Sequence, residues 1–319
     1  GDYEAIAKAG GGILTTQRAV CDSSLEALAD ALAARLGRMA ALGVTSCEVK
    51  SGYGLVAAEE RKQLEAIARV GARSDVPRVV PTFLALHALP VEARRDAGTR
   101  RAYVEGVAGE TLAEIAHAKL AMFVDAYVDA SAFQIDEARF VGERARALGL
   151  GLRLHVGQFA DIGGAELCAE LGAASADHLE HVSAAGVRRM ADAGTHAGLL
   201  PTACFTLKQE PPPIALFRDA GVPMVIASDA NPGTAPTESL PLAMAFAVRV
   251  YGLTPDEAIV GATRHAATSL GLNAGVLRAG AAADLVVWDL PHEHAIVQPW
   301  GTSKTRFVVC RGRTLYSRS

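Results

Sequence analysis

The sequence predicts an α/β barrel followed by a small β unit, and three observations support this prediction. Short apolar segments alternate with amphipathic helical segments along most of the 319 residues, as in a parallel sheet wrapped by helices. Polar residues and Gly or Asn turns cluster where the apolar segments end. After Gly271 the alternation stops and three strand-like segments follow. We therefore expect a barrel over residues 1–272 and the β unit over residues 273–319.

The composition favours one large domain with an appendage and excludes several classes of partner. Half of the residues are hydrophobic and the net charge is −4, so neither nucleic acid nor an anionic membrane is indicated. No apolar run reaches the roughly 18 residues of a membrane span. The five cysteines are scattered and form no CxxC pair, which predicts reduced thiols in a cytoplasmic protein.

Capping residues and glycines delimit the predicted helices. Asp22-Ser23-Ser24 predicts the start of a long amphipathic helix that Gly43 ends. Gly10-Gly11-Gly12 interrupts an earlier helical pattern and is either an anion cradle or a flexible turn. The predicted helices cover residues 3–9, 25–42, 57–72, 111–120, 135–148, 164–171, 184–193, 214–220, 240–251 and 255–270.

The predicted barrel strands are short apolar runs between these helices. A closed parallel barrel needs eight strands, whereas the sequence shows seven, so one strand is misread or lies before Gly1. The β unit has strands at 283–289, 306–310 and 314–316. The barrel strands cover residues 44–50, 78–84, 122–127, 151–155, 176–180, 196–200 and 223–227.

Asp229 marks the stretch around which we expect the rest of the chain to be organised. It follows the last predicted strand, and Asn231-Pro232-Gly233 then forces a turn. A carboxylate at the end of a buried strand is costly unless it meets a cation or a hydrogen-bond donor. Barrel enzymes keep their chemistry at these strand ends.

Two histidines lie, like Asp229, at or near the ends of predicted strands. His155 ends one predicted strand and His178 lies near the end of the next. A single histidine at a strand end is more often structural. Two histidines and an aspartate together at one barrel mouth suit a divalent Zn, Fe or Mn ion. A bound cation lowers the pKa of its water and yields a hydroxide nucleophile. Asp229 can take the proton of the water and pass it to a leaving nitrogen.

Other strand-end residues are candidates for substrate binding. Tyr53, in a Gly-flanked turn, can donate to a carboxylate or carbonyl group, and His87 either binds substrate or is a plain loop residue. Asn231, Gly233 and Thr234 offer a nest for an anion. The remaining histidines are expected on surfaces or in structural positions: His117, His181, His196, His265, His292 and His294.

Four motifs resemble the imidazolonepropionases of the amidohydrolase superfamily. They are Ala9-Gly10-Gly11-Gly12-Ile13, the stretch 48–55 around Lys50-Ser51-Gly52-Tyr53-Gly54, Ser175-Ala176-Asp177-His178-Leu179-Glu180, and Ser228-Asp229-Ala230-Asn231-Pro232-Gly233. The likeness covers nearly the whole chain, and residues 275–289 are similar to the return of amidohydrolases into a β-sandwich. It implies a distorted (β/α)8 TIM barrel with a small β-sandwich built from both chain ends.

The resemblance also implies a reaction and a site. The reaction is hydrolysis of the cyclic amide of 4-imidazolone-5-propanoate to N-formimidoyl-L-glutamate, a step of histidine degradation that uses one zinc or iron ion. The family commonly forms homodimers. By matched position, His155 and Asp229 are metal ligands and His178 orients the water or the oxyanion. Gln158 contacts the imidazolone ring, and substrate or product is held by Tyr53, His87, Asn231, Gly233 and Thr234.

The sequence departs from the family pattern in three places. The family has a His-x-His pair on its first barrel strand, and none occurs on a barrel strand here. With two ligands left, we expect weak metal binding or slow turnover, and a first strand that lies outside this chain. Gly157 stands where the family often has Asp, and Val128-Asp129 where it often has Cys-Glu. Two alternatives stay open: a relative acting on another cyclic amide or heterocycle, and a metal-free barrel that serves as a binding or scaffold protein.

Overall fold

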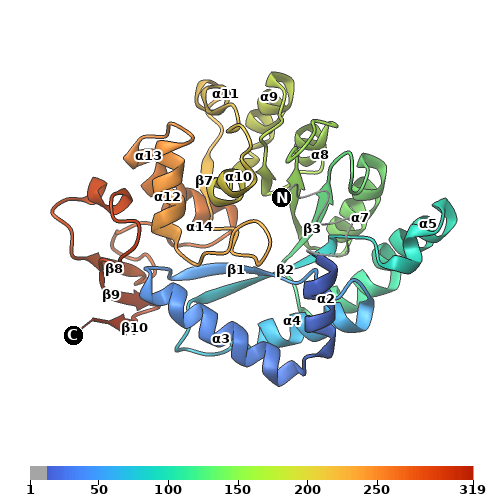
Figure 1. The fold of residues 1–319 in the computed structure, drawn as a ribbon, viewed down its shortest axis with the longest axis horizontal. Helices are drawn as coiled ribbons and strands as arrows, with labels where there is room; N and C mark the ends of the chain where they lie inside the picture. Colours follow the sequence, from blue (N-terminus) through green and yellow to red (C-terminus); the bar gives the residue numbers. More distant parts are fainter. Residues whose placement is uncertain (1–12, 319) are drawn as a thin grey trace.

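The chain folds as a curved parallel sheet with helices on its outer side and a small antiparallel sheet beside it (Figure 1). This computed structural model describes residues 13–318. The predicted helix at residues 3–9 and the turn at Gly10-Gly11-Gly12 lie outside the described residues.

The large sheet has seven strands in sequential order, and every neighbouring pair is parallel. This confirms the seven predicted strands. Within the described residues β1 and β7 are the two edges of the sheet, so it forms an open, curved part of a barrel. The strands are β1 (Ser46–Lys50), β2 (Arg78–Leu86), β3 (Phe123–Val128), β4 (Gly151–Val156), β5 (Ser175–His178), β6 (His196–Leu199) and β7 (Met224–Ile226).

Helices follow the strands and form an arc around the outside of the sheet (Figure 1). The start of α3 is as predicted, because the Ser24 side chain accepts a hydrogen bond from the Ala27 amide. The helices are α2 (Ile13–Asp22), α3 (Leu25–Ala41), α4 (Ala57–Gly71), α5 (Ala97–Gly106), α6 (Leu112–His117), α7 (Ile135–Ala147), α8 (Gly164–Glu170), α9 (Ala184–Ala193), α10 (Pro201–Leu207), α11 (Ile214–Ala220), α12 (Leu240–Arg249), α13 (Pro255–Val260) and α14 (Ala266–Ser269).

Some predicted boundaries are wrong. The helix expected at 111–120 begins at Ala97, where Asp96 and Thr99 form a capping box, and a π-helical turn, η2 (Val107–Thr111), joins α5 to α6. A second π turn, η3 (Gly261–His265), divides the helix expected at 255–270. The short helix α10 and the 3₁₀ segments η1 (Val91–Arg94) and η4 (Glu293–Val297) were not predicted.

The small sheet contains β8 (Leu285–Trp288), β9 (Thr305–Cys310) and β10 (Arg313–Ser317), paired antiparallel in the order β10-β9-β8. Among residues 13–318 it is a single layer, so the expected second layer of a sandwich is not seen. It is joined to the barrel by an ion pair between Arg78 and Asp284 at 2.9 Å, and the Ser303 hydroxyl donates to the Ala41 carbonyl.

The core between sheet and helices holds the strand ends in fixed positions. Fully buried side chains such as Phe83, Leu86, Leu154 and Phe217 fill this layer. Close packing of this kind leaves the backbone little freedom, so side chains at the strand ends keep their relative places. In the described part of the chain, no helix is long and apolar enough to cross a bilayer.

Candidate active site

The carboxyl ends of the parallel strands bring His155, His178 and Asp229 to the same edge of the sheet. His155 and His178 lie on the adjacent strands β4 and β5, with ring centroids 5.3 Å apart. Asp229 follows β7. Burial raises the pKa of Asp229 to about 6, and the nearby charges of His155 and Lys50 oppose this rise. His155 and His178 are therefore neighbours, and the charge of His155 acts on Asp229.

Asp125, a residue of β3, is the hydrogen-bond partner of His155. The Nδ1–H group of His155 donates to Asp125 Oδ1 at 3.0 Å, and the backbone amide of His155 donates to the same oxygen at 3.2 Å. Burial opposes ionisation of Asp125, but His155 and Lys50 hold its pKa well below the ordinary value. Burial opposes the charged form of His155, but Asp125 raises the pKa of His155 above its ordinary value. With Nδ1 engaged, Nε2 is the ring nitrogen that can bind a metal ion once its proton is released.

A buried network of charges lies beneath the strand ends. Lys50 Nζ lies 2.8 Å from both Glu48 Oε1 and Asp125 Oδ2, and 3.9 Å from Asp177 Oδ2. Arg153 pairs with Glu48 at 3.1 Å and approaches Asp177 at 4.0 Å. Three carboxylates thus face two permanent cations in one buried network.

The donor atoms fit a divalent metal ion. Asp125, His155 and Asp177 offer atoms within 4.8 Å of one another. The Lys50 ammonium group already lies against these carboxylates, and His155 Nδ1 carries its proton towards Asp125. We therefore interpret this group as the support beneath an ion that would bind at His155 Nε2 and the Asp229 carboxylate, a nitrogen and oxygen set suited to zinc or iron.

His178 ends its strand in an uncommon backbone conformation. His178 and Leu179 both have positive φ angles, 81° and 68°, which ends β5 two residues earlier than predicted. Such strain is typical of functional positions. Burial, and then the charge of His155, lower the pKa of His178 well below its ordinary value, so its imidazole is neutral.

Tyr53 and His87, which follow β1 and β2, contact each other. Their rings meet edge to face with centroids 4.9 Å apart. His87 Nδ1–H donates to the Gly52 carbonyl at 2.7 Å, and burial lowers the pKa of His87 to about 4. His87 is therefore neutral and leaves Nε2 as a hydrogen-bond acceptor.

Glu60 fixes the loop that carries Tyr53. Its buried carboxylate accepts hydrogen bonds from the amides of Gly52 at 2.7 Å, Gly54 at 2.6 Å and Leu55 at 2.8 Å. A carboxylate with three backbone donors is a strong anchor. This residue of α4 was not predicted as part of the site.

The loop after β7 is held by Asn231. Its amide nitrogen donates to the Asp229 carbonyl at 2.7 Å and to Asp229 Oδ2 at 3.1 Å. Its amide oxygen accepts from the Gly233 and Thr234 amides, each at 2.8 Å. The groups that the sequence predicted as an anion nest are thus bonded to one another and orient Asp229, and their role towards a product stays a prediction.

Comparison with known proteins decides the family. The sequence profile of the amidohydrolase family matches residues 27–315. The imidazolonepropionase of Mesorhizobium japonicum is 42% identical over 98% of this chain and 76% of its own length. That of Chromobacterium violaceum is 45% identical over 97% of this chain and 75% of its own length. The chain belongs to the imidazolonepropionase family of amidohydrolases. It is a hydrolase with a small-molecule substrate, and metal dependence is a property of this family.

Solved structures agree with this assignment at the level of the fold. A triazine hydrolase variant has a TM-score of 0.68 at 16% identity, over 89% of this chain and 71% of the other. An atrazine chlorohydrolase from Arthrobacter aurescens, solved with zinc, has a TM-score of 0.63 at 14% identity, over 99% of this chain and 75% of the other. The predicted amidohydrolase barrel is thereby confirmed. The chain spans about three quarters of the length of its imidazolonepropionase relatives.

Two departures from the imidazolonepropionase pattern have a structural role here. Gly157 has φ 65°, and a Cβ atom would lie 2.5 Å from the His181 carbonyl oxygen, so no larger residue fits this conformation. Asp129 is buried, and its Oδ2 accepts from the Phe159 amide at 2.8 Å. Both residues shape the loop that carries Gln158, which is itself buried.

Three of the histidines that were expected to be structural have partners other than the residues of the candidate site. His196 and His265 contact the carbonyls of Ala174 and Met224, and His294 pairs with Asp256 at the surface. Sequence reasoning missed several site residues that share one signal. Each is a charged side chain in or just after an otherwise apolar strand: Glu48, Lys50, Asp125, Arg153, Asp177 and Glu180.

Proposed function

We propose that this protein hydrolyses the cyclic amide of 4-imidazolone-5-propanoate to N-formimidoyl-L-glutamate, a step of histidine degradation. The observation that carries the proposal is the identity of 42–45% with imidazolonepropionases over almost the whole chain. The shared edge of His155, His178 and Asp229 supports it. The Glu60-anchored loop carries Tyr53, which contacts His87, and we propose that this pair meets the substrate ring.

One divalent ion, zinc or iron, is proposed at His155 Nε2 and Asp229, where it would supply Lewis acidity and lower the pKa of water. Asp229 takes the proton of the attacking water as its oxygen adds to the ring carbonyl carbon. Asp229 then delivers that proton to the ring nitrogen as the C–N bond breaks, which leaves a carboxylate and a free formimidoyl nitrogen. His178 faces the oxygen that gains negative charge.

The other predicted residues bind the substrate. Tyr53 donates to a carboxylate or carbonyl group, and neutral His87 accepts at Nε2 from a ring N–H group. Gln158 is proposed at the imidazolone ring. Asn231 and its loop neighbours Gly233 and Thr234 are proposed at the glutamate-like end of the product, where their present hydrogen bonds with one another would be exchanged.

We propose the cellular location and the assembly of the protein on the basis of the same family. The five cysteines are all free, as suits the reducing cytoplasm. A homodimer remains the proposed assembly, without nucleic-acid or membrane partners. A related reaction on another cyclic amide or heterocycle is the competing enzymatic function, and a panel of such rings separates the two.

Ring opening followed by mass spectrometry tests the proposal. We expect N-formimidoyl-L-glutamate to form with the zinc- or iron-loaded protein, and Asp229→Asn to lower kcat at least roughly 100-fold. Asp75→Asn, at an exposed ion pair with Arg73, is the matched control and should leave the rate unchanged. Preference for another ring would replace the proposed substrate. An unchanged rate and metal content in Asp229→Asn would favour the metal-free scaffold.

A further inference from the structure

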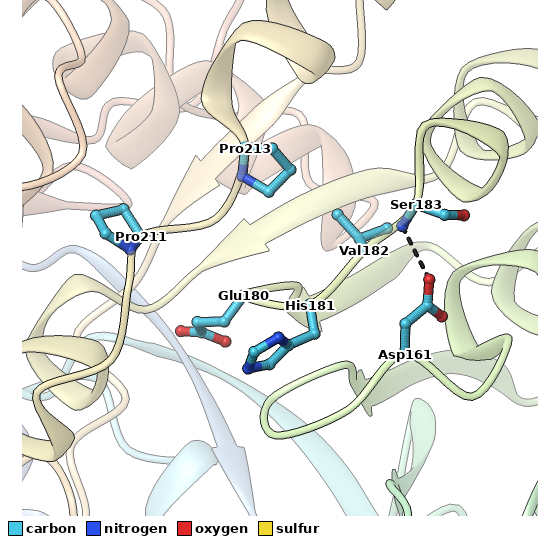
Figure 2. A pocket seen from close by; sticks show the side chains of 7 residues that line it. All are labelled: Asp161, Glu180, His181, Val182, Ser183, Pro211 and Pro213. Carbon is cyan, nitrogen blue, oxygen red and sulfur yellow. Dashed lines mark hydrogen bonds between the residues drawn. The ribbon is translucent and has the colours of Figure 1, made fainter.

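Gln209 lies in the segment between α10 and α11, which forms one wall of a pocket that the segments after β4 and β5 also line (Figure 2). Pro211 and Pro213 of this segment line the pocket together with His181. Two hydrogen bonds of its backbone fix Gln209 at the end of α10. Its amide donates to the Cys204 carbonyl at 3.1 Å, and its carbonyl accepts from the Cys204 thiol at 3.4 Å.

The side chain of Gln209 reaches the loop after β4. Its Nε2 atom donates to the Gln158 carbonyl oxygen at 2.6 Å. Because a carbonyl oxygen can only accept, the amide nitrogen of Gln209 must face it, and the direction of this hydrogen bond is fixed by the two groups themselves. The other polar atom of the side chain, Oε1, is buried and has no partner among the described residues. The bond at Nε2 is therefore the polar contact that holds this side chain in place.

The peptide unit between Gln158 and Phe159 is held at both ends. Gln209 Nε2 binds its C=O group, and Asp129 Oδ2 accepts from its N–H group, the Phe159 amide, at 2.8 Å. The two side chains come from different elements, since Asp129 follows β3 and Gln209 follows α10. A peptide unit is planar, so bonds at both of its ends fix the plane and with it the direction in which the Gln158 side chain leaves the backbone.

We propose that Gln209 is a positioning residue that, together with Asp129, orients the Gln158 side chain towards the substrate ring. This inference rests on the proposed function for the contact between Gln158 and the imidazolone. On the other side of Gln158 the backbone is already held, because the Gly157 carbonyl accepts from the His181 amide at 2.7 Å. The bond from Gln209 restricts the motion that remains, which is rotation of the peptide unit after Gln158.

The expected consequence is tighter binding of the substrate. A side chain that is oriented before the substrate arrives loses less conformational entropy when the complex forms. Without the bond from Gln209, Gln158 must be ordered by the substrate itself, which weakens binding about 3–10-fold. A contact that is equally strong with bound substrate and in the transition state changes KM and leaves kcat unchanged.

Steady-state kinetics of Gln209→Met test the inference, because methionine is about as long as glutamine and cannot donate. We expect KM for the imidazolone to rise about 3–10-fold with kcat nearly unchanged. Gln298→Met, at an exposed glutamine, is the matched control and should change neither constant. In a Gln158→Ala background, Gln209→Met should have no further effect on KM, because Gln209 acts through Gln158.

Two kinetic results would overturn the inference: a native KM in Gln209→Met, or the same rise in KM with and without the Gln158 side chain. If Gln209→Met does not fold, Gln209→Glu decides in its place, since it keeps the shape of the side chain and puts an oxygen where the N–H donor was.

Nuclear magnetic resonance separates this inference from the proposed function, because it needs no substrate. The side-chain amide signals of Gln158 are assigned by their loss in Gln158→Ala. We expect Gln209→Met to shift these signals and Gln298→Met to leave them in place. Unchanged signals in Gln209→Met would overturn the inference. Shifted signals in a protein without activity on the imidazolone ring would contradict the proposed function and leave the orienting role of Gln209 standing.

Discussion

Asp125 Oδ1 lies 3.0 Å from His155 Nδ1, and this contact leaves Nε2 as the ring nitrogen of His155 that Asp125 does not engage. The other Asp125 oxygen lies 2.8 Å from Lys50 Nζ. A carboxylate behind a ligating histidine fixes the tautomer of the ring and strengthens its donor nitrogen. We therefore propose that Asp125, held in turn by Lys50, sets the orientation of the proposed metal ligand.

Asp125→Asn should weaken zinc binding about 10–100-fold, because the amide cannot polarise His155 as a carboxylate does. Competition with a chelator of known affinity measures the change. Asp75→Asn serves as control, since Asp75 pairs with Arg73 at the surface. Equal zinc affinity in the Asp125 variant and the control would rule out the supporting role.

Lys50→Met should destabilise the fold by about 3–5 kcal/mol, because it leaves the buried carboxylates of Glu48 and Asp125 without their shared cation. Chemical denaturation of the metal-free protein measures the free energy of unfolding. Lys62→Met is the matched control, where a partly exposed pair with Glu59 is lost at a cost of no more than about 1 kcal/mol. A similar small cost at Lys50 would mean that the network contributes little to stability.

Glu60→Gln should raise KM for the imidazolone more than it lowers kcat. The variant removes one of the oxygens that hold the loop amides around Tyr53, so the substrate-binding loop loses its fixed position. Steady-state kinetics give the two constants separately. Glu65→Gln, on the exposed face of the same helix, should change neither. A loss of kcat at constant KM would place Glu60 in a different role.

The order of strands and the strand-end residues could be predicted from the sequence, because apolar runs and turn residues are local signals. The helix α5 could not be predicted, because Gly98 and Gly106 weaken the helical pattern of this segment. Its start is set by the capping box at Asp96. The charged network was also missed. Lys50 and Asp125 lie on different strands, and only the curvature of the sheet brings their side chains together.

Glu180 predicts a pH dependence of stability. Its pKa rises on folding from an ordinary 4.5 to about 8, so the folded state keeps a proton that the unfolded chain loses. The stability that this proton contributes is fully present below pH 4.5 and is lost as pH rises through about 8. The groups that face Glu180 are His178, Asp229, Asp129 and Tyr251.

Thermal unfolding of the chelator-treated protein from pH 5 to pH 9 measures this dependence against Glu180→Gln, which cannot ionise. The native protein should lose melting temperature relative to the variant as pH rises, and the difference should level off above about pH 8. Parallel curves for the two proteins would show that Glu180 is not protonated in the folded state.

X-ray absorption at the zinc edge tests most directly whether His155 and Asp229 share one ion. The account predicts one zinc per chain with imidazole nitrogen and carboxylate oxygen at about 2.0–2.2 Å. His155→Ala should remove the imidazole signal, and Asp229→Ala should reduce the oxygen shell. A zinc spectrum that is the same in the native protein and in both variants would contradict it.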